Sequence, residues 1–170
     1  MVKRNATLDV ITSSHRFNGE YNLPGTGVLG VLGDTLTTFI ELRQAKMGRL
    51  QTADNLSQQA PVIRVIKHQI AAICLNRRED MGQITAARAY ARVIKYPLRV
   101  STQLFELEGT FEWAGMFDLS VMMATQGSDF IPLFDASLGG VIFPNLLIQA
   151  PVIIFNRSFM NSVVVMNEGL

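Results

Sequence analysis

The tetrapeptide Ala60-Pro61-Val62-Ile63 recurs as Ala150-Pro151-Val152-Ile153, and this repetition at an offset of 90 residues indicates two copies of one unit. Each tetrapeptide opens a long apolar stretch, residues 61–75 in the first copy and 151–166 in the second. Repeats at a fixed offset are the sequence signature of a duplicated structural unit. The chain of 170 residues is therefore predicted to be a tandem duplication.

Basic residues interrupt both apolar stretches at matching positions. Lys67-His68-Gln69 lies inside the first stretch and Arg157-Ser158-Phe159 inside the second. An apolar run of this length with a polar break near its middle is typical of two strands joined by a tight turn. We therefore expect a strand pair at the end of each copy, with its basic turn exposed.

The segments upstream of the tetrapeptides also correspond. Phe17 to Leu23 and Phe105 to Trp113 alternate between apolar and polar residues, which indicates strands with one buried face. Gly19 and Gly109 lie at matching points on the apolar faces, where a glycine is typical of a bend or a bulge. Further strands are predicted at 6–14, 38–45, 97–104 and 129–136, and short helices at Gly27 to Leu36 and Met116 to Ala124.

These elements predict a mainly β fold with two tandem, strongly bent sheets or small barrels and short helices. The first unit would span residues 1–82 and the second 83–170. Residues 84–95 contain strong helix formers after a capping threonine, so they are predicted to form a helical connector that Pro97 ends.

The motifs of each copy resemble those of the Sm-like (LSm) family. Ser13-Ser14-His15-Arg16-Phe17-Asn18-Gly19-Glu20-Tyr21 with Ile40-Glu41-Leu42-Arg43-Gln44-Ala45 is similar to the first Sm motif. Val62 to Ile70 and Val152 to Met160 are similar to the second, a β run with a tight basic turn. The resemblance implies a five-stranded bent barrel that assembles when the fourth strand of one domain pairs with the fifth strand of the next.

The resemblance also implies RNA contact at the basic turns, through Lys67, His68 and Arg157. Two departures bear on that role. The family's Asp-x-x-x-Asn base-binding segment is replaced by the helix-like insertion at Pro24 to Thr37, and its Arg-Gly reads Ile66-Lys67 and Asn156-Arg157. Strand-mediated assembly therefore carries over more directly than base recognition.

Composition argues against an enzyme. Cys74 is the single cysteine and the chain has two histidines, so no thiolate metal cluster or cofactor site is predicted. No catalytic motif accompanies these residues. The formal net charge of +1 does not indicate binding to nucleic acid or to an anionic surface. No hydrophobic signal core follows Met1, so we expect a cytoplasmic protein without a membrane span.

The apolar surplus points to self-association. Hydrophobic residues make up 48% of the chain and charged residues only 17%. This is more apolar surface than two small barrels need to bury. Two apolar runs are predicted to lie near strand edges that a second copy could cover: Val141, Ile142 and Phe143, and Val163, Val164 and Val165. The function predicted is a non-catalytic, self-assembling scaffold subunit in a ring or filament. An RNA-binding Sm-like ring and a small-ligand-binding regulatory module remain as alternatives.

Overall fold

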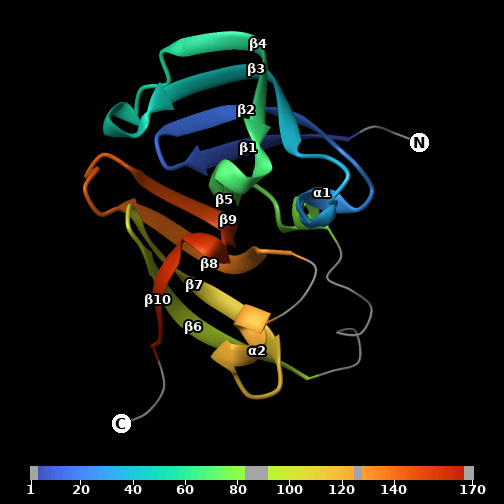
Figure 1. Ribbon diagram of the computed structural model, residues 1–170, viewed down its shortest axis with the longest axis vertical. Coiled ribbons are helices and arrows are strands. Elements are labelled where there is room, and N and C mark those ends of the chain that lie inside the picture. Colours follow the sequence, from blue (N-terminus) through green and yellow to red (C-terminus); the bar gives the residue numbers. More distant parts are fainter. Residues whose placement is uncertain (1–3, 83–91, 125–127, 167–170) are drawn as a thin grey trace.

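The computed structural model describes residues 4–82, 92–124 and 128–166, and its strands form one antiparallel sheet (Figure 1). The strands are β1 Arg4–Thr12, β2 His15–Leu23, β3 Phe39–Arg49, β4 Gln58–Ile66, β5 Ile70–Leu75, β6 Val93–Thr102, β7 Phe105–Ala114, β8 Phe130–Gly140, β9 Leu147–Asn156 and β10 Met160–Val165. Their order across the sheet is β10-β6-β7-β8-β9-β5-β1-β2-β3-β4. The predicted mainly β class is confirmed.

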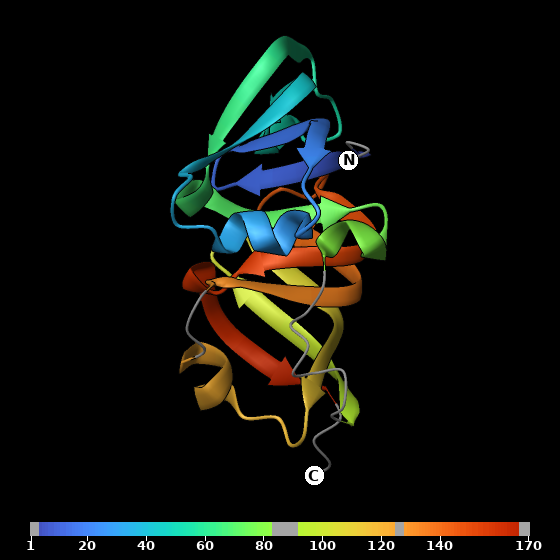
Figure 2. The same cartoon turned by 90° about the vertical axis from the view of Figure 1, so that its right-hand side faces the viewer.

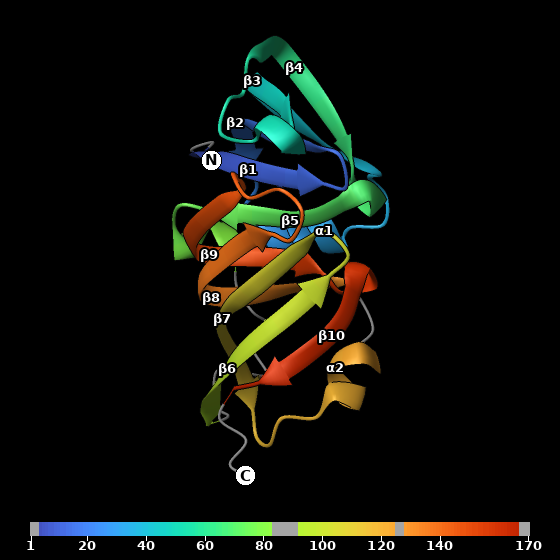
Figure 3. The same cartoon turned by 90° about the vertical axis from the view of Figure 1, so that its left-hand side faces the viewer.

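Both halves of the sheet have the same strand order. In the first half the fifth strand pairs with the first, and the second, third and fourth follow outward; the second half repeats this sequence from β10 to β9. The halves meet where β5 pairs with β9, the fourth strand of the second half. They lie end to end along the long axis (Figures 2 and 3), and the sheet is not closed: β4 and β10 are its two ends.

Each half bends at the glycine that the sequence singled out. The pairing register between β2 and β3 shifts beside Gly19, and that between β7 and β8 shifts beside Gly109. Gln44 and Asp135, on the strands opposite, have φ values of 47°, in the left-handed region that non-glycine residues seldom adopt. A Cβ atom at position 109 would lie 2.8 Å from the Ala136 Cβ, so glycine is required there for the two strands to approach. The predicted bulges are confirmed.

A short helix connects the second and third strands of each half. Helix α1 spans Gly27–Gly33 and α2 spans Leu119–Ala124, both shorter than predicted. The predicted connector helix fares differently: residues 84–91 lie outside the described residues, and Val93 to Lys95 form the start of β6. That part of the prediction is wrong because Val93 and Ile94 are β-branched residues that favour strands over helices, and this segment pairs with β7.

The hydrophobic core does not divide at the boundary between the halves. One cluster contains Leu8, Leu42 and Val28 of the first half together with Val152 and Ile154 of the second. The other cluster is centred on the second half and includes Ile11 and Cys74 of the first. Each half therefore completes the core of the other across the β5–β9 junction.

Candidate self-association edges and basic turns

The two ends of the sheet expose apolar side chains. On β4, Val62 and Ile66 are each 41% exposed. On β10, Val164 is 51% exposed, and Met166 directly after the strand is 48% exposed. Unpaired edge strands present free backbone donors and acceptors, and they are templates for pairing with another chain.

The β5–β9 junction shows how the same two kinds of strand pair within the chain. Ile73 lies opposite Ile154, Cys74 opposite Ile153 and Leu75 opposite Val152, in antiparallel register. All six side chains are at most 3% exposed. The equivalent positions on β10 and β4, 90 residues along the sequence in either direction, include the exposed Val164 and Val62. Each open edge thus carries exposed positions whose counterparts are buried at the junction.

The two predicted edge runs are placed differently. Val163, Val164 and Val165 lie on β10, an open edge, as predicted. Val141, Ile142 and Phe143 lie in the turn between β8 and β9, and each of those strands has a neighbour on both sides. The run 141–143 therefore does not lie on an open edge strand, because the chain turns back there from β8 into β9.

Lys67 is buried rather than presented to solvent. Its ammonium group donates hydrogen bonds to the backbone carbonyls of Val31 and Asp34 and to the Thr37 hydroxyl, the last two at 2.8 Å. These carbonyls lie at the C-terminal end of α1, where cations complement the unpaired acceptors. Burial lowers the pKa of Lys67, and Asp34 nearby opposes that effect.

Arg157 does the same in the second half. Its Nη1 donates to the Met122 carbonyl of α2 at 2.9 Å, and its Nε pairs with Asp129 at 3.2 Å. Each basic turn therefore fastens the helix of its own half. Because the contact spans more than 30 residues of sequence, local patterns could not reveal it, although a basic residue and a helix recurring together at one offset could have suggested it.

One open hollow of about 460 Å³ brings the three predicted contact residues together. Lys67, His68 and Arg157 line it with Asp129 and Phe130, at the level where the halves join. The charged groups of Lys67 and Arg157 are already hydrogen-bonded to helix carbonyls. Of the three predicted contact residues, the exposed His68 is therefore the one whose side chain could contact a ligand.

A second cavity, of about 310 Å³, adjoins the β5–β9 junction and contains an internally neutralised ion pair. Arg16 donates through Nε to one carboxylate oxygen of Asp9 at 2.8 Å and through Nη1 to the Ala53 carbonyl, also at 2.8 Å. The hydrogen bond to Asp9 raises the pKa of Arg16. Burial raises the pKa of the neighbouring Cys74 thiol, so its nucleophilic thiolate form is suppressed.

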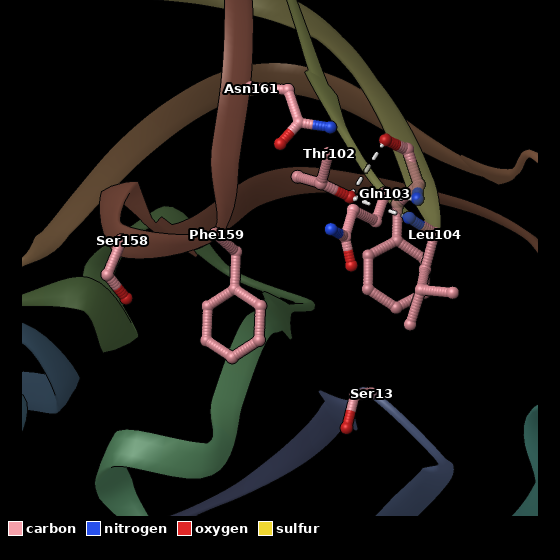
Figure 4. Close-up of a pocket in the computed structure, with 8 residues that line it drawn as sticks. Ser13, Thr102, Gln103, Leu104, Ser158, Phe159 and Asn161 are labelled. Carbon is pink, nitrogen blue, oxygen red and sulfur yellow. Dashed lines mark hydrogen bonds between the residues drawn. The ribbon is translucent and has the colours of Figure 1, made fainter.

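The third cavity, of about 220 Å³, has no charged side chain in its lining (Figure 4). It lies between Ser13, the β6–β7 turn and Phe159. The Thr102 hydroxyl there accepts from the Leu104 and Phe105 amides and donates to the Phe105 carbonyl, so it is committed to closing the turn. Thr12 closes the β1–β2 turn of the first half with similar bonds.

The described residues meet neither the requirements of a metal site nor those of a membrane-spanning helix. Among those residues no three His, Cys, Asp or Glu side chains gather in a way that could hold a metal ion. No helix within them has the length and apolar character needed to span a bilayer. In comparisons with known proteins, no family model, curated protein or solved structure matches this chain.

Proposed function

We propose that this protein is a non-catalytic, self-assembling structural subunit in which β10 of one copy pairs with β4 of the next. The observation that carries the proposal is the β5–β9 junction. It joins a fifth strand to a fourth strand, and among the described strands it leaves one further fifth strand, β10, and one further fourth strand, β4, each paired on one side only. This is also the pairing that the Sm-like resemblance implies.

The junction supplies a register for the contact between copies. Moving each junction pair by the 90-residue offset puts Val163 opposite Arg64, Val164 opposite Ile63 and Val165 opposite Val62. Two of these three pairs are wholly apolar. Arg64 is already paired with Glu41 at 3.1 Å, and its guanidinium lies 5.8 Å from the centre of the Phe39 ring. Its charge therefore has a partner within its own copy.

The test is light scattering over a range of protein concentrations. The unmodified chain should have a mass well above 18.8 kDa, and Val164→Asp should lower it to that of a single chain, because a carboxylate would be buried unpaired among apolar side chains. Ile142→Asp is the matched control: Ile142 is 63% exposed but lies in the β8–β9 turn, so its substitution should leave the mass unchanged. An unmodified chain that stays monomeric at micromolar concentration refutes the proposal.

Disulfide trapping tests the register itself. In a Cys74→Ala background, chains with Ile63→Cys and chains with Val164→Cys should cross-link when mixed and oxidised. Residues directly opposite each other on paired strands lie within disulfide range. The slipped control, Val62→Cys with Val164→Cys, should cross-link much less. A preference for the slipped pair contradicts the register.

RNA binding is the competing proposal, and one observation favours it: the shared hollow of Lys67, His68 and Arg157. If RNA bound there, affinity would fall steeply with salt as phosphate contacts release counterions. The double variant Lys67→Ala with Arg157→Ala would also abolish binding. We expect weak binding at most, because both charged groups fasten helices.

A further inference from the structure

Helix α1 is covered at the β5–β9 junction by the other half of the chain. Phe130, the first residue of β8, packs partly buried against the cluster that contains Val28 and Leu32 of α1. Phe130 and Leu32 also line the same hollow. The strand-to-strand junction thus has a second component, in which an aromatic side chain from the third strand of one half lies against the helix of the other.

The residues equivalent to Phe130 and to helix α1 are exposed at opposite ends of the molecule. Phe39 begins β3 as Phe130 begins β8, and it is 40% exposed; Ile66, its cross-strand neighbour on β4, is 41% exposed. On α2, Leu119 is 40% exposed and Met123 is 42% exposed. Figure 1 shows α2 at the far end of the second half, well away from β3 and β4.

We propose that α2 of one copy is the docking surface for Phe39 and Ile66 of the next copy. The inference rests on the proposed function, because pairing of β10 with β4 brings these surfaces together as β5 with β9 brings α1 to Phe130. A flexible thioether such as that of Met123 also makes favourable contacts with aromatic rings. The occupant is therefore a second copy of this chain.

One chemical difference from the junction supports this occupant. At the junction, Asn156 is paired with Phe130 in the register, is 4% exposed, and donates from Nδ2 to the Ile70 carbonyl at 3.1 Å. The residue equivalent to Asn156 at the open edge is Ile66, and the residue equivalent to Ile70 is Met160. A polar contact within the chain is thus replaced by an apolar pair between copies, which suits a surface whose other members are Phe39 and Met123.

Cross-linking of two single-cysteine chains tests the docking directly. In the Cys74→Ala background, a Phe39→Cys chain mixed with a Met123→Cys chain should yield a covalent dimer with a short bismaleimide. Either chain alone should yield little dimer, because the two positions belong to opposite surfaces. A mixture of Phe39→Cys with Val141→Cys, a 55% exposed position in the β8–β9 turn, is the matched control. Equal yields from the two mixtures overturn the inference.

Charge substitution gives an independent readout by light scattering. Phe39→Glu and Met123→Glu should each raise the concentration needed for half assembly at least tenfold, while Val141→Glu should not change it. If the unmodified chain assembles and Val164→Asp disperses it, but neither glutamate variant has an effect, the helix contact is refuted and strand pairing stands. If the unmodified chain is monomeric, both proposals fail.

Discussion

Replacing Gly109 with alanine should destabilise the fold through one contact that the structure defines. The new Cβ would lie 2.8 Å from the Ala136 Cβ and 3.1 Å from the Phe134 carbonyl oxygen. Carbon atoms in contact are normally about 3.5–4.0 Å apart, so the strands must separate by several tenths of an ångström or more. Overpacking of this kind costs about 1–3 kcal/mol.

Gly139→Ala is the matched control, because Gly139 lies in β8 and a Cβ atom there would meet nothing within 4 Å. Both variants lose about the same backbone entropy from the unfolded chain, so the difference in free energy of unfolding between them isolates the steric cost. Thermal melts at one protein concentration should separate the two by about 2–4 °C for each kcal/mol. Equal midpoints would show that the bulge does not require glycine at position 109, and the steric argument for glycine at position 19 would fail with it.

Two further predictions concern the fastening of α1 and the junction thiol. Lys67→Met should lower the free energy of unfolding by roughly 1.5–3 kcal/mol, because it removes hydrogen bonds from a charged group, whereas His68→Ala at the exposed neighbouring position should have little effect in chemical denaturation; equal losses would contradict the fastening role. Cys74 should react with a thiol reagent only as fast as the chain opens, since it is 3% exposed and burial raises its pKa. The introduced thiol of a Cys74→Ala, Val164→Cys chain should react quickly in dilute protein and become protected as the protein concentration rises. Protection that does not depend on protein concentration would count against β10 as a contact between copies.

The strands could be predicted from sequence because period-two alternation and glycine position are local signals. Phe17 to Leu23 and Phe105 to Trp113 fall within β2 and β7, and both basic turns lie where the apolar stretches break. The start of β6 was predicted wrongly because the helix formers before it were extended to Lys95, although the β-branched Val93 and Ile94 favour a strand and pair with β7.

The candidate site was harder to predict than the fold. The residue types at the basic turns were visible, but the role of Lys67 depends on carbonyls of a helix about 35 residues earlier in the chain. The exposure of Phe39 and Ile66 depends on which strands end the sheet, and sequence periodicity does not reveal strand order. Equivalent residues of the two halves differ in exposure: those on β5 and β9 are buried at the junction, and several of those on β10 and β4 are exposed.

The β5–β9 junction lies within one polypeptide, and this fixes the number of five-stranded units in an assembly as even. Every intact chain contributes two five-stranded units already joined, so a closed assembly of intact chains holds an even number of units, and rings with an odd number are excluded. In the assembly that we propose, dilution can separate only alternate junctions, since the others lie within a polypeptide. Mass measurements on any closed form should therefore advance in steps of two units, never one.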